Sequence, residues 1–246
     1  MPSPEIGIIL QARMGSSRLP GKVMRPLAGR PMIAHAIARL LRCRTIGRVI
    51  LATSERPEDD PLAQFAATLN VDVFRGSELD VLDRYYRCAR QYGLQQIVRA
   101  TGDNPFVDPE ECDRLVSAHL EAETDYMYAF ASGLPVGIGV EVFTIDALER
   151  SWRDGREPHH REHVDEHMLE NPDLYRQALL LAPAAKRAPK LSFTVDTPAQ
   201  FAGAERAVAV LGDGDPDHRV TTERLIGLGL SLVPLGEQAL ATNSGA

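Results

Sequence analysis

The chain of 246 residues contains little cysteine, since Cys43, Cys88 and Cys112 are its only three. An odd number of cysteines without C-x-x-C spacing indicates neither a disulfide framework nor a zinc site. This usage is typical of a reducing compartment, so we expect a cytoplasmic protein.

Long apolar runs are missing as well. The longest apolar stretch, Ala178 to Ala185, is interrupted by Pro183 and is far shorter than the roughly 20 residues that a membrane-spanning helix needs. The N-terminus leads straight into a predicted strand, without the cationic start and apolar core of a signal peptide. We therefore expect no membrane span and no signal peptide.

An excess of positive charge is also absent, because the formal net charge is −7. Proteins that bind nucleic acid usually have a basic balance or a basic face. The charge therefore argues against a nucleic-acid partner, and any anionic ligand must be met by local cations.

Two common phosphate-loop motifs, G-x-x-x-x-G-K-[ST] and G-x-G-x-x-G, do not occur. However, the segment Gln11–Lys22, QARMGSSRLPGK, follows the apolar run Ile6–Leu10, which has the length and β-branched content of a buried strand. The segment is rich in small residues and carries the cations Arg13, Arg18 and Lys22. Such a loop after a first strand suits a polyanion, for which we predict a nucleoside triphosphate. An ordinary Arg-containing turn is the alternative.

The order of predicted elements favours an α/β fold. Their alternation indicates a parallel sheet with helical crossovers, formed by one domain with an inserted lobe. We predict strands at residues 6–10, 48–54, 71–76, 95–100, 125–130, 133–143 and 190–195, and helices at residues 31–41, 58–69, 79–92, 108–120, 199–211 and 221–227.

Two acidic residues directly follow predicted strands. Asp103 lies between Gly102 and Asn104, and Asp196 precedes Thr197 and a helix. The carboxyl ends of strands are where α/β sheets present catalytic groups, and Mg²⁺ takes one or two carboxylates together with phosphate oxygens and water. Asp103 is therefore a candidate Mg²⁺ ligand. For both residues, capping of a turn or helix is the alternative.

Other polar residues have both a structural and a functional interpretation. Ser77 stands at the start of a predicted helix, where short polar side chains act as caps. Glu141 lies between Val140 and Val142, so it points to the opposite face of its strand, towards solvent or towards a ligand.

A histidine-rich segment, residues 156–171, holds four of the seven histidines. His163 and His167 are four residues apart, a spacing that suits zinc on a helix. The order H-E-x-x-H is missing, however, so we favour a polar helix close to a substrate.

Several segments together resemble a known family. QARMGSSRLPGKVMRPLAGRPMI, TGDNPFVDPE, GVEVFTIDALE, REHV and LSFTVDTPAQF follow one another as in the sugar-activating cytidylyltransferases. This family includes CMP-Kdo synthetase, acylneuraminate cytidylyltransferase and the group of the spore-coat polysaccharide protein SpsF, which is the most similar. The resemblance covers roughly residues 5 to 210.

The resemblance implies a Rossmann-like, three-layer α/β nucleotidyltransferase fold of the GT-A type, with a mostly parallel central sheet and a small inserted lobe. Residues 1–246 would form one domain. Residues 131–190 would be its acceptor-binding and dimerisation lobe, which predicts a homodimer.

The implied activity is transfer of CMP from CTP to an anionic sugar acid, sugar phosphate or phosphonate. Pyrophosphate would be released, and the product would serve surface polysaccharide or related biosynthesis. Mg²⁺ would be the cofactor, held by Asp103 and Asp196, which together with Arg13 and Lys22 form the predicted catalytic set. The predicted substrate-binding residues are Gln11, Ala12, Gly15, Ser16, Ser17, Arg18, Ser77, Glu141, Arg161 and His163.

The chain departs from the family at Val136 and Gly139, where relatives often carry Asp, so we expect a different acceptor pocket. A GT-A glycosyltransferase that uses a nucleotide sugar is one alternative activity. A non-catalytic nucleotide-binding protein is the other.

Overall fold

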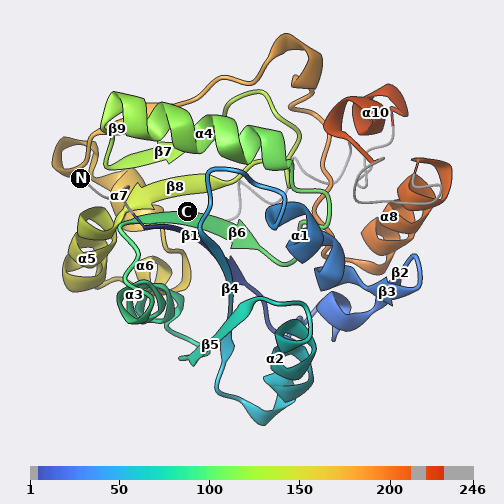
Figure 1. Cartoon of the computed structure of the whole chain (residues 1–246), viewed down its shortest axis with the longest axis horizontal. Coiled ribbons are helices and arrows are strands. Elements are labelled where there is room, and N and C mark those ends of the chain that lie inside the picture. The colour runs from blue at the N-terminus through green and yellow to red at the C-terminus, as the bar shows by residue number, and fades with distance from the viewer. Residues whose placement is uncertain (1–4, 212–219, 230–246) are drawn as a thin grey trace.

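The structure is a computed structural model that describes residues 5–211 and 220–229. In this part of the chain, the central sheet has seven strands in the order β5-β4-β1-β6-β8-β7-β9, beside a two-stranded hairpin (Figure 1). The strands of the sheet are β1 (Ile6–Gln11), β4 (Arg48–Ser54), β5 (Asp72–Gly76), β6 (Gln96–Thr101), β7 (Tyr126–Tyr128), β8 (Glu141–Thr144) and β9 (Gln177–Leu179), and the hairpin pairs β2 (Pro26–Leu27) with β3 (Arg30–Pro31).

The sheet is mostly parallel, as predicted. β1 pairs in parallel with β4 and β6, and β4 pairs in parallel with β5. β8 is antiparallel to both β6 and β7, whereas β7 and β9 are parallel. The carboxyl ends of β1 and β6 therefore lie side by side at one edge of the sheet.

Helices cover both faces of the sheet, which gives the predicted three layers (Figure 1). The helices on one face are α1 (Met32–Leu40), α2 (Asp60–Ala67), α4 (Pro109–Ala122), α8 (Pro198–Leu211) and α10 (Thr222–Gly227). Those on the other face are α3 (Val81–Gln91), α5 (Ile145–Asp154), α6 (Pro158–Glu162) and α7 (Glu166–Glu170). Short 3₁₀ turns are η1 (Lys22–Met24), η2 (Pro57–Asp59), η3 (Pro172–Leu174) and η4 (Ala184–Lys186).

The first strand shows why this sequence forms a sheet with two covered faces. Ile8 and Leu10 belong to the apolar core on one side, and Ile9 belongs to the core on the other. All three side chains are completely buried. Because successive side chains of a strand point to opposite faces, an uninterrupted apolar run fits a strand with helices on both sides.

Two predictions of strand position are wrong. Residues 190–195 form an extended segment without a ladder, because the amides of Phe193 and Val195 donate to the carbonyls of Val136 and Asp103, which lie in loops. In the predicted strand at 133–143, regular pairing begins only at Glu141. Before it, Gly137 has a φ of 85°, outside the range of a strand.

Residues 131–190 supply β8 and β9 to the central sheet and helices α5, α6 and α7 to one of its faces. Neither α5 nor β9 is among the predicted elements. The role of this segment in dimerisation stays a prediction. Among the described helices, none has the length and apolar character that crossing a membrane requires.

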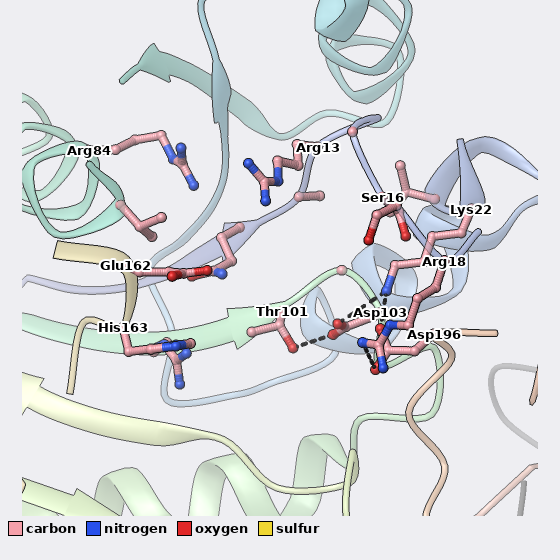
Figure 2. A pocket seen from close by; sticks show the side chains of 18 residues that line it. Arg13, Ser16, Arg18, Lys22, Arg84, Thr101, Asp103, Glu162, His163 and Asp196 are labelled. Atoms are coloured by element: carbon pink, nitrogen blue, oxygen red, sulfur yellow. Dashed lines mark hydrogen bonds and ion pairs between the residues drawn. The ribbon is translucent and has the colours of Figure 1, made fainter. Parts of the chain in front are cut away.

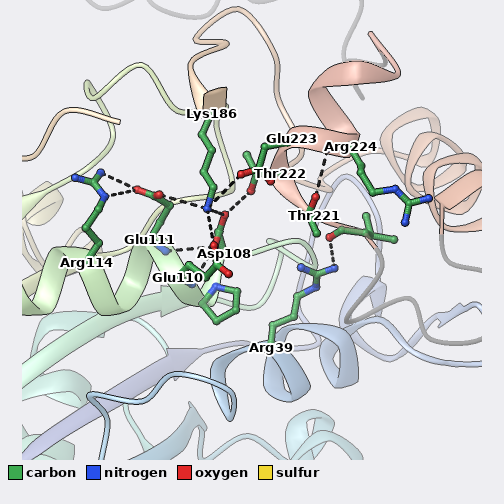
Figure 3. A network of polar contacts seen from close by, with 12 residues as sticks. Arg39, Asp108, Glu110, Glu111, Arg114, Lys186, Thr221, Thr222, Glu223 and Arg224 are labelled. Atoms are coloured by element: carbon green, nitrogen blue, oxygen red, sulfur yellow. Dashed lines mark hydrogen bonds and ion pairs between the residues drawn. The ribbon is translucent and has the colours of Figure 1, made fainter. Parts of the chain in front are cut away.

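A buried ion cluster ties helix α10 to helix α4 (Figure 3). Lys186 Nζ lies 2.8 Å from Asp108 Oδ2 and 3.4 Å from Glu111 Oε1, and the Thr222 hydroxyl donates to the same Asp108 oxygen at 2.7 Å. Burial alone would raise the pKa of Asp108, but the hydrogen bonds from Lys186 and Thr222 hold it below its usual value. The cluster therefore fixes the start of α4, which follows the Asp103 loop.

Candidate active site

The predicted loop and both predicted carboxylates line one cavity of about 560 Å³ at the carboxyl ends of β1 and β6 (Figure 2). Among its lining residues are these predicted site residues: Gln11, Ala12, Arg13, Gly15, Ser16, Ser17, Arg18, Lys22, Asp103, His163 and Asp196.

Lys22 joins the two carboxylates. Its Nζ lies 2.6 Å from Asp196 Oδ1 and 3.4 Å from Asp103 Oδ2, and it donates to the carbonyl of Val195 at 2.9 Å. Only 8% of Lys22 is exposed. Asp196 also pairs with Arg18 at 3.0 Å. Two carboxylates far apart in the sequence therefore converge on one point, as predicted.

Glycine before Asp103 allows this convergence. A Cβ on Gly102 would come within 2.7 Å of Ala12 Cβ and 2.8 Å of Ile33 Cδ1. The Gly102 amide donates to the carbonyl of Gln11 at 2.8 Å. Any larger residue here would push the Asp103 turn away from the end of β1.

The loop after β1 is anchored by Asp59, a buried residue that no sequence motif singles out. Asp59 Oδ1 accepts the Met14 amide at 2.6 Å, while Oδ2 accepts both the amide and the hydroxyl of Ser54. Within the described chain, the amides of Gly15 and Ser17 donate to no protein acceptor. The loop thus offers N–H groups to a ligand, which suits phosphate oxygens.

The atoms that accept hydrogen bonds from Lys22 Nζ would also suit a hard divalent cation. All of them are oxygens, from the carboxylates of Asp103 and Asp196 and the carbonyl of Val195. An ammonium held at this point shows that the surrounding oxygens favour positive charge. Mg²⁺ prefers such oxygen ligands and binds through one or two carboxylates with substrate phosphates, so Asp103 and Asp196 are suitable ligands for it.

A second cavity, of about 280 Å³, adjoins the first and shares Arg99, Thr101 and Asp103 with it. Glu141 faces this second cavity and lies 2.9 Å from Arg99 Nη1. Burial, reinforced by the nearby Asp165, raises the pKa of Glu141 to about 7, although Arg99 acts in the opposite direction. The cavity therefore contains a carboxyl group that titrates close to neutral pH.

The two positions where the chain departs from the resembling family also line the second cavity. Val136 is 51% exposed there. A Cβ on Gly139 would lie 3.0 Å from Ala129 Cβ. A larger residue at position 139 would therefore require Ala129 to move. Neither residue brings a charge to the cavity.

A family model described as cytidylyltransferase matches residues 7–215. The chain belongs to the cytidylyltransferase family. It is 38% identical over 198 residues to the spore coat polysaccharide biosynthesis protein SpsF of Bacillus subtilis, which covers 78% of this chain and 82% of SpsF.

Solved structures agree with this cytidylyltransferase assignment. A cytidylyltransferase from Leptospira borgpetersenii has a TM-score of 0.84 and 28% identity, with 92% of this chain and 93% of that chain covered. CMP-Kdo synthetase in complex with CTP has a TM-score of 0.62 at 20% identity, with 84% of this chain and 99% of that chain covered. At that identity, the second likeness shows the shared fold alone.

Two predicted substrate-binding residues of this cytidylyltransferase, Ser77 and Arg161, line neither of these two cavities. The Ser77 hydroxyl accepts the amide of Asp80 at 3.0 Å and so closes the turn that leads into α3, whose N-cap is Asp80. Arg161 donates to Asp80 Oδ2 at 2.6 Å and to the carbonyl of Trp152 at 2.8 Å, so its guanidinium fastens α6 to the start of α3. The structure brings neither of them to the other predicted residues, whereas His163 does line the cavity.

In the histidine-rich segment of the cytidylyltransferase, residues 156–171, two of the histidines form hydrogen bonds within the protein. His159 and His160 contact the two carboxylate oxygens of Glu170 at 2.8 and 2.6 Å. Because His160 Nδ1 accepts the Glu157 amide at 3.3 Å, Nε2 carries the proton and has no lone pair for a metal. These contacts favour a polar helix over a zinc site.

Arg84 is a further residue of the cytidylyltransferase cavity that no sequence pattern reveals. It lies on α3, one turn after Val81, which also lines the cavity. The helical pattern of its neighbours predicts a helix but does not show which polar side chain faces inwards.

Proposed function

We propose that this protein transfers CMP from CTP to an anionic sugar acid, sugar phosphate or phosphonate and releases pyrophosphate. The carrying observation is Lys22, which joins Asp103 and Asp196 beside a cationic loop with unpaired amides. Membership of the cytidylyltransferase family supports CTP as the donor, and so does the complex of CMP-Kdo synthetase with CTP. The name of the relative SpsF supports a product for surface polysaccharide biosynthesis.

In this reaction an acceptor oxygen forms a bond to the α-phosphorus of CTP. The bond from that phosphorus to the bridging oxygen breaks, and pyrophosphate leaves with the electron pair. An acceptor that is already an anion needs no general base. The main task of the protein is therefore to position two anions and to reduce their repulsion.

In this proposal the cations of the loop bind the triphosphate. Arg13 and Lys22 would hold the β- and γ-phosphates with assistance from Arg18, and the amides of Gly15 and Ser17 would donate to phosphate oxygens. In the arrangement without nucleotide, Lys22 neutralises the carboxylate pair. We propose that its ammonium turns to the phosphates when the nucleotide binds.

Asp103 and Asp196 would hold Mg²⁺. When bound there, the ion supplies charge neutralisation and makes the α-phosphorus more electrophilic. The Thr101 hydroxyl donates to Asp103 Oδ1 at 2.6 Å, which keeps the other oxygen of that carboxylate directed at the site.

The test is to incubate the protein and Mg²⁺ with each nucleoside triphosphate and a panel of sugar acids, sugar phosphates and phosphonates. We expect pyrophosphate and a CMP conjugate with CTP and at least one acceptor. The matched controls are Asp103→Asn and Glu110→Gln, since Glu110 has an 80% exposed side chain outside the cavity. CTP binding without product for any acceptor would favour a non-catalytic protein. Sugar transfer from a nucleotide sugar would favour a glycosyltransferase.

A further inference from the structure

Glu141 presents a carboxylate with unused acceptor capacity to the second cavity. Both of its oxygens accept from a single nitrogen, Arg99 Nη1, at 3.0 and 2.9 Å. Among the described residues, no other donor forms a hydrogen bond with either oxygen. Because only 13% of the Glu141 side chain is exposed, water compensates little of its charge. A ligand in the cavity therefore meets a carboxylate that is only partly satisfied.

The charges around the second cavity are unbalanced. Of the described residues that line it, Arg99 is the only cation, whereas Asp103 and Glu141 are carboxylates. Asp103 is paired with Lys22 from the main cavity. Arg99 Nη1, however, lies 2.9 Å from Glu141 Oε2 and 3.5 Å from Asp165 Oδ1. Two buried carboxylates thus share one guanidinium, so a further cation would be stabilised here and a further anion would be repelled.

The other walls of the cavity also suit a cation. Phe130 lines it, is 54% exposed, and stacks on Tyr128 with ring centroids 4.4 Å apart. An exposed aromatic ring attracts a neighbouring ammonium. Burial raises the pKa of Glu141 to about 7, and the charge of Asp165 adds to this effect while Arg99 opposes it. A positive charge beside Glu141 would offset both causes of the rise.

We propose that the second cavity takes a positively charged amino group of the acceptor, with Glu141 as its counter-ion. This inference rests on the proposed function and narrows its acceptor class to an amino sugar acid, an amino sugar phosphate or an aminophosphonate. The attacking oxygen of such an acceptor lies towards Asp103, where the two cavities meet, and its ammonium donates to Glu141. An N-acetylated or hydroxylated analogue lacks this charge, which makes Glu141 a specificity-determining residue.

The experiment measures pyrophosphate release by the full chain from CTP and Mg²⁺, with pairs of acceptors that differ in the amino group. The pairs are glucosaminate with gluconate, glucosamine phosphate with N-acetylglucosamine phosphate, and aminoethylphosphonate with hydroxyethylphosphonate. Glu141→Gln removes the charge and keeps the size of the side chain. Glu110→Gln is the matched control, because the Glu110 side chain is 80% exposed and lies outside the second cavity.

We expect wild type to favour the amino member of at least one pair by about tenfold or more in kcat/KM, as for a hydrogen bond between charged groups. Glu141→Gln should bring this ratio close to one. The change should come mainly from a higher KM for the amino acceptor, because the contact is made in the ground state as well as in the transition state. The KM for CTP should stay the same, and Glu110→Gln should behave as wild type.

Val136→Lys supplies a second test that does not require Glu141→Gln to fold. Val136 is 51% exposed at the wall of the cavity, so a longer side chain fits there. The added ammonium would compete for Glu141 and repel the amino group of the acceptor, and the preference should fall. Val136→Met has a similar length without the charge and should keep the preference.

Three results would contradict the inference. If wild type released pyrophosphate equally with both members of every pair, or favoured the uncharged member, the amino group would play no part and the proposed function would still stand. A preference that persisted in both Glu141→Gln and Val136→Lys would mean that Glu141 is not the counter-ion. If no acceptor gave pyrophosphate with CTP, the proposed function would fail together with this inference.

Discussion

The amide of Val195 donates a hydrogen bond of 2.9 Å to the carbonyl of Asp103. This main-chain contact sets the next residue, Asp196, beside the Asp103 turn, so that Lys22 reaches both carboxylates. Because the backbone makes the contact, replacing either carboxylate by an amide leaves the two segments joined. Variants at these positions therefore report on the charge of the carboxylates.

Asp103→Asn should lower turnover by about 10²–10³-fold, the usual range for loss of one electrostatic contact to a transition state. CTP binding should change much less, because the loop cations remain. The measurement is kcat for pyrophosphate release together with the Kd for CTP. Near-normal turnover of this variant with Mg²⁺ would show that Asp103 is not a metal ligand.

Arg13→Ala should chiefly weaken binding of the triphosphate. Loss of a charge-assisted contact to phosphate is expected to raise the Kd for CTP by about tenfold or more. Binding of CMP, which has no β- or γ-phosphate, should change little. Arg25→Ala is the control, since Arg25 is exposed and does not line the cavity. Equal weakening of CMP and CTP would argue against contact with the outer phosphates.

Titration of Glu141 should make the free energy of unfolding depend on pH. Its pKa rises from 4.5 in the unfolded chain to about 7 in the folded protein. Between these two pH values the folded state binds a proton that the unfolded state releases. Stability contributed by this proton is complete below pH 4.5 and is lost as pH rises to about 7, with a slope of at most about 1.4 kcal/mol per pH unit.

The measurement compares the free energy of unfolding of wild type and Glu141→Gln across this range. The variant has no titrating group at this position, so the difference between the two curves should decline from acid to neutral pH. A difference that does not change with pH would mean that Glu141 stays charged beside Arg99 throughout. An offset between the two proteins that does not depend on pH does not affect this test, because only the change of the difference with pH is used.

Lys186→Met should destabilise the fold by about 3 kcal/mol, because it leaves the buried carboxylates of Asp108 and Glu111 without their cation. The free energy of unfolding in urea measures this effect. Glu110→Ala removes an exposed partner of the same lysine and should cost less than about 1 kcal/mol. Similar losses in both variants would contradict a buried cluster with Lys186 at its centre.

Much of the fold could be predicted because its main signals are local. The buried strand at Ile6–Gln11 and the glycine- and serine-rich loop after it are continuous patterns, and parallel pairing brings the ends of neighbouring strands together. The position of Asp103 follows from these rules. Residues 190–195 look like a strand by composition, but their partners are loop residues, which no local pattern reveals.

The site residues that sequence did not predict depend on distant partners. Asp59 anchors the loop after β1 through Met14, and Arg84 faces the cavity because of the way α3 packs on the sheet. The guanidinium of Arg161 could bind an anionic ligand, but in the structure it forms an ion pair with Asp80. In each case the role depends on a residue brought close only by folding.

The most direct test of the central claim follows the α-phosphorus of CTP. The protein is incubated with Mg²⁺, an acceptor that supports pyrophosphate release, and CTP labelled at the α-phosphorus, in parallel with Asp103→Asn and Asp196→Asn. We predict that wild type moves the label to the acceptor and that both variants lose this transfer. Transfer at an undiminished rate by either variant, or label that stays in the nucleotide with wild type, would contradict the account.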